Sequence, residues 1–226
     1  MRPFKNDFCA QCGSNNPTER DHVPPKNIFL EPRPSTLIVS PICASCHAGT
    51  SLDDEYFRDM LIFRGDLKDN EAVKKLTPKV LRGLSRPEKR KTVQAMAENL
   101  RKMEVKSQLG LFLGYGNMYT ITKERFERVI TRTIKGIFYH EDHEPLSKGS
   151  AVGTYLLDAI DFKKYKGSEG IINELANCPE VIIEQSTFRY RRFRNIEEGY
   201  EVWLLTFYNR VESISFIVHP QVINEA

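Results

Sequence analysis

Three short stretches within the first fifty residues decide how this chain begins to fold: CAQC at residues 9–12, DHVPP at residues 21–25 and CASCH at residues 43–47. Two Cys-x-x-Cys pairs bracket a loop that carries an acid next to a histidine, and the second pair runs directly into another histidine. Four thiolates in two such pairs are typical ligands of one tetrahedral zinc ion. The sequence therefore predicts an N-terminal region stapled by metal.

The four candidate zinc ligands are Cys9, Cys12, Cys43 and Cys46. A complete set of four thiolates leaves no open coordination position, which indicates a structural zinc ion and not a catalytic one. The fifth cysteine, Cys178, stands alone in the sequence, and we interpret it as a small buried apolar residue.

Composition sets broad limits on what the protein can be. The chain has 226 residues, of which 40% are hydrophobic, enough for one large domain or two small ones. A net charge of +3 permits binding to nucleic acid without demonstrating it. No apolar run approaches the ~18 residues of a membrane span, and the N-terminus has no apolar signal segment. We therefore expect a cytoplasmic protein with no membrane partner.

The middle of the chain shows apolar residues at helical spacing. Ser85 and Glu88 form a capping box before one such run, and its apolar stripe continues as far as Met103. We expect helices over residues 52–65, 70–82, 89–106 and 123–139.

The last third changes character, with β-branched and aromatic residues between short turn sequences. We expect a helix over residues 168–177 and an antiparallel meander whose strands lie within 181–183, 188–193 and 201–218. The fold class that follows is α+β, with a zinc-stapled N-terminal module, a helical region and a C-terminal antiparallel-sheet domain. The predicted boundaries are 1–66 for the N-terminal module, 67–115 for the helical connector and 116–226 for the C-terminal domain.

The pair Asp21-His22 places a hard oxygen ligand beside an imidazole. On an extended strand these adjacent side chains face opposite ways, whereas on a bent or bulged turn they converge on one site. An unligated His22 can take a proton from water at neutral pH, while Asp21 can hold a divalent cation. His47 follows a candidate zinc ligand directly, so the metal fixes its backbone and suits it to be a second cation ligand.

This ordered set of residues resembles the HNH endonuclease family and its ββα-metal fold, over roughly residues 5–65. The resemblance implies that His22 is the general base and that Asp21 and His47 hold the catalytic cation. Mg²⁺ or Mn²⁺ fits so few protein ligands, and the imidazole also accepts Ni²⁺ or Zn²⁺. The implied reaction is metal-dependent hydrolysis of phosphodiester bonds, with DNA as the favoured substrate.

The sequence departs from the family pattern at Ile38, where many HNH proteins have an asparagine that braces the loop. Asn27, Ser35 and Thr36 are alternatives for this bracing role, and the sequence does not choose among them.

Several basic residues are candidates for contact with nucleic acid. Lys26 and Arg33 lie in the loop between the cysteine pairs, and the run from Arg189 through Arg191 and Arg192 interleaves cations with aromatic residues. Solvated loop cations and a protected edge strand are the alternative interpretations.

Two other functions stay open. The same knuckles suit a non-catalytic zinc module that binds nucleic acid or a protein, and the same catalytic residues suit an RNA-cleaving nuclease. A single site cuts one strand at a time, so double-strand cutting would require a homodimer or two sequential nicks.

Overall fold

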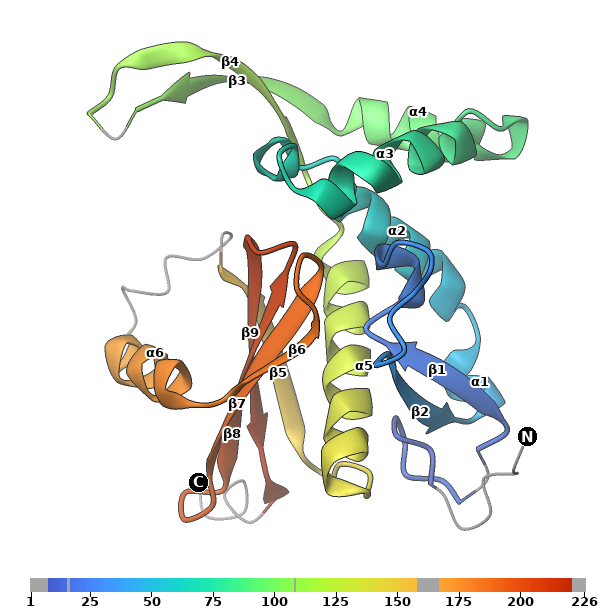
Figure 1. Cartoon of the computed structure of the whole chain (residues 1–226), viewed down its shortest axis with the longest axis vertical. Helices are drawn as coiled ribbons and strands as arrows, with labels where there is room; N and C mark the ends of the chain where they lie inside the picture. The colour runs from blue at the N-terminus through green and yellow to red at the C-terminus, as the bar shows by residue number, and fades with distance from the viewer. Residues whose placement is uncertain (1–7, 16, 108, 158–166, 221–226) are drawn as a thin grey trace.

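The computed structural model describes residues 8–15, 17–107, 109–157 and 167–220 (Figure 1). Near the N-terminus, strand β1 (Glu19–Val23) pairs antiparallel with strand β2 (Ile38–Ile42), and the short 3₁₀ helix η1 (Lys26–Ile28) lies between them. The hairpin is followed by a single helical turn, α1 (Ala44–His47), and by the longer helix α2 (Thr50–Ile62). The expected helix over 52–65 is therefore confirmed, with a start two residues earlier.

Helix α3 (Glu71–Leu84) confirms the expected helix over 70–82. Its N-cap is Asn70, whose side-chain oxygen accepts hydrogen bonds from two backbone N–H groups of the first turn. The turns η2 (Gly65–Leu67) and η3 (Pro87–Lys89) flank it. The predicted capping box is wrong, because the Ser85 hydroxyl donates backward to the carbonyl of Leu81 and closes α3.

The expected helix over 89–106 is wrong in its second half. Helix α4 (Arg90–Glu98) stops early, and strand β3 (Leu100–Lys106) pairs antiparallel with strand β4 (Phe112–Tyr119). The apolar stripe through Met103 fits a helix and a strand alike over so short a run. The turn decides between them, because Gly110 adopts a φ of +80° and donates to the Ser107 carbonyl, which reverses the chain.

The C-terminal part contains a five-stranded antiparallel sheet in the order β5-β9-β8-β7-β6. The strands are β5 (Ala151–Leu156), β6 (Glu180–Glu184), β7 (Phe188–Asn195), β8 (Tyr200–Phe207) and β9 (Val211–Val218). Helix α6 (Ser168–Asn177) packs against the sheet through Leu175, beside Val202 and Ile214. The expected meander and the helix over 168–177 are confirmed, whereas edge strand β5 was not anticipated.

Helix α5 (Lys123–Asp142) lies at the centre of the molecule, between the large sheet and the N-terminal hairpin (Figure 1). It confirms and slightly extends the helix expected over 123–139. Its apolar face joins a hydrophobic cluster that also includes Phe57 of α2 and Trp203 of β8. Phe207 and Tyr208 are buried in the same cluster.

One close approach fixes how α5 crosses the hairpin. A Cβ placed on Gly136 would come within 2.7 Å of the Val23 side chain and 3.0 Å of Ser40 Oγ, so only glycine fits there.

The structure is thus a mixed α+β fold with antiparallel sheets, as expected. The domain boundaries at 66 and 115 stay a prediction. Within the described residues, every helix is too short or too polar to cross a bilayer.

Candidate metal centre and the adjoining cleft

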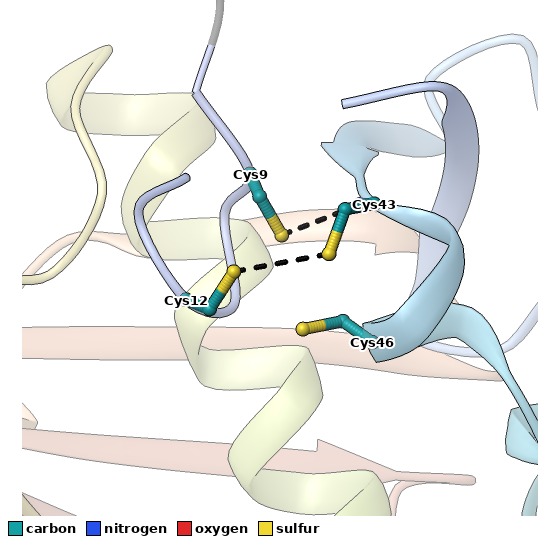
Figure 2. A group of neighbouring side chains, drawn as sticks. All are labelled: Cys9, Cys12, Cys43 and Cys46. Carbon is teal, nitrogen blue, oxygen red and sulfur yellow. Dashed lines mark hydrogen bonds between the residues drawn. The ribbon is translucent and has the colours of Figure 1, made fainter. Parts of the chain in front are cut away.

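The four cysteines of the two Cys-x-x-Cys pairs meet at one point (Figure 2). Their sulfur atoms all lie within 4.8 Å of one another, and Cys12 Sγ is 3.8 Å from Cys43 Sγ. That separation is far longer than a disulfide bond of ~2.05 Å. It matches the edge of about 3.8 Å that a tetrahedron with Zn–S bonds of ~2.3 Å would have. The group is positioned to bind a metal ion and is compatible with a structural zinc site.

Backbone hydrogen bonds of the protein itself hold the two cysteine pairs near each other. Gly13 takes a φ of +71°, which lets the chain turn after Cys12, and its N–H donates to the Cys9 carbonyl. The N–H of Ala10 donates to the Pro41 carbonyl at 2.9 Å and so ties the first pair to strand β2. The two pairs are therefore brought together by the hairpin.

The environments of the sulfur atoms differ. Ser45 Oγ lies 3.1 Å from Cys43 Sγ, and this hydrogen bond, with one from the backbone N–H of Cys46, lowers the pKa of Cys43 to about 6. Burial raises the pKa of Cys9, although the N–H of Cys43 donates to its sulfur at 3.4 Å. A metal ion would supply the positive charge that a buried Cys9 thiolate needs.

Asp21 and His22 occupy adjacent positions of a regular strand, paired with Ser40 and Val39 of β2. Strand alternation therefore sends their side chains to opposite faces of the hairpin, the first of the two arrangements that the sequence left open. Asp21 is only 4% exposed, on the face covered by α5, whereas His22 is half-buried on the other face.

Asp21 already has a cationic neighbour in this fold. Arg132 Nε of α5 lies 2.9 Å from Asp21 Oδ2, and the same guanidinium contacts Asp54 of α2. Neither Arg132 Nε nor Asp21 Oδ2 makes a hydrogen bond among the described residues, so the contact is an ion pair whose N–H points away from the oxygen. Burial raises the pKa of Asp21, and the charges of Arg132 and His47 oppose that rise.

His47 lies at the end of α1 and turns toward β1. Its Nδ1 contacts the Glu19 carboxylate, and Glu19 stands two residues before Asp21 on the same face of the strand. Glu19 was not among the site residues predicted from the sequence. Its place two residues before Asp21, and therefore on the same face of a strand, was the signal that could have identified it.

His22 has a different electrostatic surrounding. Burial lowers its pKa, and the positive charges of Lys26 and Arg33 lower it further. The imidazole is therefore neutral at pH 7 and lies in the neighbourhood of two cations. Arg33 also pairs with Glu31 at 2.8 Å and donates to the Lys26 carbonyl, so the loop is internally connected.

The described residues contain one group in which three or more potential metal-ligating atoms lie within 4.8 Å of one another, and it is the four cysteines. Asp21 and His47 do not form a further group of that kind with another described residue.

The loop before Ile38 is held by contacts other than the asparagine that many HNH proteins have at this position. Ile38 is buried and pairs with Val23 in the hairpin. Of the three alternatives, Thr36 makes a long-range contact, because its hydroxyl donates to the Ile183 carbonyl of β6 at 3.0 Å. Asn27 Oδ1 is buried without a hydrogen-bond partner among the described residues.

The three candidate arginines of β7, Arg189, Arg191 and Arg192, are engaged within the protein. Arg189 and Arg191 both contact Glu180 of β6, and Arg191 also donates to carbonyl groups at the end of α6. Arg192 contacts carboxylates of α5 and of β8, and its side chain is 13% exposed. A phosphate-binding role for these residues would have to break those ion pairs.

A cleft of about 950 Å³ adjoins the cysteine group. It lies between Cys46, the start of α2 and the polar side of α5. Four cations of α5 line it, at positions separated by three or four residues and therefore on one face of the helix: Arg125, Arg128, Arg132 and Lys135.

The sequence predicted this helix from its apolar residues alone. Its four cations also recur at intervals of three or four residues, and that spacing was the signal that could have identified a basic face. Within the cleft, Asp53 at the start of α2 accepts from Arg125 and Arg128, each at 2.7 Å. Arg128 remains 59% exposed in its side chain and faces the open cleft. Asp53 therefore forms ion pairs that join the first turn of α2 to α5.

No protein-family model, curated protein or solved structure matches this chain. The resemblance to HNH endonucleases is neither supported nor contradicted by these comparisons, so the function is argued from the site itself.

Proposed function

We propose that the protein is a metal-dependent HNH endonuclease that hydrolyses phosphodiester bonds in DNA, with Zn²⁺ held by the four cysteines as a structural ion. The observation that carries the proposal is the contact between His47 Nδ1 and the Glu19 carboxylate, which brings the last histidine of the motif beside the strand of the Asp-His pair. Asp21 lies two residues further along the same face of that strand.

Asp21 and His47 are the proposed ligands of the catalytic cation. The buried oxygen Asp21 Oδ2 accepts no hydrogen bond among the described residues, but Arg132 Nε lies 2.9 Å from it, so a bound cation would have to displace that guanidinium. Mg²⁺ or Mn²⁺ suits a site with few protein ligands, and the imidazole also admits Ni²⁺ or Zn²⁺. When bound, such a cation would stabilise the negative charge that develops on the phosphate.

His22 is the proposed general base. Its neutral imidazole at pH 7 can accept a proton from the attacking water through the unprotonated ring nitrogen. Lys26 and Arg33, whose charges act on His22, would hold phosphate groups next to it. Because Asp21 and His22 face opposite ways, the proposed position of the scissile phosphate is along the outer edge of β1, between the two faces of the strand. Within the described chain, β1 pairs with β2 alone, so that edge has no strand on it.

The test is cleavage of supercoiled plasmid by zinc-loaded protein with Mg²⁺, Mn²⁺ or EDTA. We expect divalent-dependent cleavage that falls about 10²- to 10⁴-fold in His22→Ala, the usual range for loss of a general base. His140→Ala is the matched control, because His140 is an exposed histidine at the far end of α5. Intact plasmid with folded, zinc-loaded wild type would count against the proposal, and parallel digestion of RNA separates an RNA nuclease from a DNA nuclease.

One observation favours a second candidate function. Arg132 pairs with Asp21 and Asp54, so the proposed cation ligand is already neutralised by a side chain of the protein. This arrangement suits a non-catalytic zinc module that binds nucleic acid in the basic cleft along α5. In that case His22→Ala would leave DNA affinity unchanged, and Arg128→Ala together with Lys135→Ala would reduce it.

A further inference from the structure

The hairpin formed by β3 and β4, here called the arm (residues 100–119), extends away from the rest of the molecule (Figure 1). None of the described residues of β3 or β4 is buried, and the same holds for the preceding helix α4. At its base, the Tyr119 hydroxyl contacts the Met60 carbonyl of α2. A two-stranded hairpin in water is marginally stable at best, so the arm needs a surface that covers it.

The arm exposes an unusual amount of apolar surface. Six large apolar side chains on it are 48% to 89% exposed: Leu109, Leu111, Phe112, Leu113, Tyr115 and Met118. At roughly 100 Å² each they offer about 600 Å². Two arms together expose about 1,200 Å² of this surface, which equals the lower limit of stable protein–protein interfaces only if all of it is covered.

The two edges of the arm differ in charge. Four of the seven residues of β3 are charged, namely Arg101, Lys102, Glu104 and Lys106. Strand β4 and the turn before it, residues 107–119, carry no charged side chain. Charges on an edge strand, lysine above all, are what prevents strands of different molecules from pairing. The edge of β3 is therefore protected, whereas the edge of β4 is open to another strand.

We propose that the arm is a dimerisation element, in which β4 pairs antiparallel with β4 of a second copy of this chain. A two-fold axis near the middle of β4 would form a continuous four-stranded sheet with both charged β3 strands at its outer edges. Gly114 and Gly116 lie in this strand, and the side chain of Val105 on β3 reaches to within 3.0 Å of the position that a Cβ of Gly116 would take. A nucleic acid is a poorer occupant, because residues 107–119 carry no cation of their own and the neighbouring Lys102 of β3 already lies over the Tyr115 ring, 4.1 Å from its centroid.

This inference goes beyond the proposed nuclease function and does not depend on it, because it concerns the protein without substrate. If both hold, the dimer would carry two N-terminal modules in one particle.

The test is sedimentation equilibrium of the full chain over a range of concentrations, without nucleic acid. We expect a monomer–dimer equilibrium in wild type. In Tyr115→Glu the dissociation constant should rise at least about tenfold, because like charges then face each other across the axis. The matched control is Met103→Glu, an exposed apolar position on β3 that should leave the dissociation constant unchanged.

Hydrogen exchange of the same samples separates loss of dimer from loss of fold. The backbone amides of β4 should exchange more slowly at high than at low protein concentration, whereas those of α5 should not change. A wild type that stays monomeric at about 100 μM, well above the Kd range of specific dimers, overturns the proposal. So does equal weakening by both variants, or protection of β4 that requires added DNA.

Discussion

Arg132 Nε on α5 lies 2.9 Å from Asp21 Oδ2 on β1, and both side chains are buried. The same guanidinium contacts Asp54 at the start of α2, so one cation joins three elements beside the cysteine group. Buried charges are tolerated only when they are paired, because each loses its hydration. This relationship links the predicted cation ligand to a residue that sequence reasoning did not connect with it.

Arg132→Met should lower the free energy of unfolding by about 3–5 kcal/mol, because it leaves the buried carboxylate of Asp21 and the half-buried carboxylate of Asp54 without this cation. Urea unfolding at neutral pH measures the change. Arg128→Met is the control, since its side chain is 59% exposed and its loss should cost under about 1 kcal/mol. Equal losses in the two variants would contradict the structural role given to Arg132. If Asp21 is a cation ligand, Mg²⁺ or Mn²⁺ should restore part of the stability of Arg132→Met and should also stabilise wild type.

The cysteine group should bind a single zinc ion, and its removal should lower the unfolding temperature. Cys12→Ser removes one ligand of the tetrahedron and should reduce the zinc content measured by elemental analysis. Cys178→Ser is the matched control, because that cysteine lies outside the group and should leave zinc content unchanged. Full zinc content in Cys12→Ser would show that the metal binds elsewhere.

Gly136→Ala should destabilise the fold by roughly 1–3 kcal/mol, because the added methyl group overlaps Val23 and Ser40 where α5 crosses the hairpin. Gly83→Ala is the opposite case. A Cβ on Gly83, inside α3, has no atom within 4 Å, so the change should stabilise by about 0.5–1 kcal/mol. Thermal unfolding of the two variants should therefore shift in opposite directions, and a shift in the same direction would argue against the α5 crossing.

Asp66 should make stability depend on pH. A hydrogen bond from Arg64, aided by Arg210, holds the pKa of Asp66 below its ordinary value of 3.8. A carboxyl group whose pKa is depressed by folding contributes stability above its unfolded pKa and loses it as the pH falls through the folded value. Wild type should exceed Asp66→Asn by roughly 0.5 kcal/mol at pH 7, since the pair is partly solvated. That difference should shrink below about pH 4. If the difference in stability between wild type and Asp66→Asn stays constant with pH, it arises from packing and not from the charge of Asp66.

Much of the secondary structure could be predicted, because periodicity is a local property. The helices α3, α5 and α6 and the β7–β9 meander follow from apolar spacing and turn residues that lie within each segment. The prediction failed at Leu100–Lys106, where a short run fits both periods and pairing with β4 decides the outcome. Strand β5 has a weak pattern of its own and forms because β9 offers it a partner.

Only part of the candidate site could likewise be predicted from the sequence. The spacing of the cysteines was enough to predict a metal-binding group, since two Cys-x-x-Cys pairs can chelate only if they converge. The contacts of His47 with Glu19 and of Thr36 with Ile183 join residues far apart in the sequence, so no local pattern announces them. The spacing of the cations of α5 could be recognised in the sequence, but their position along the cleft could not.

The sequence by itself determined the cysteine group, the α+β class and the positions of most helices and strands, because these depend on spacing within short segments. Only the tertiary structure decided that Asp21 is buried against Arg132, that the β7 arginines pair with carboxylates, and that the arm stands apart. These outcomes depend on which charges and surfaces meet across the fold, and electrostatic pairing and burial act between residues without regard to their separation along the chain.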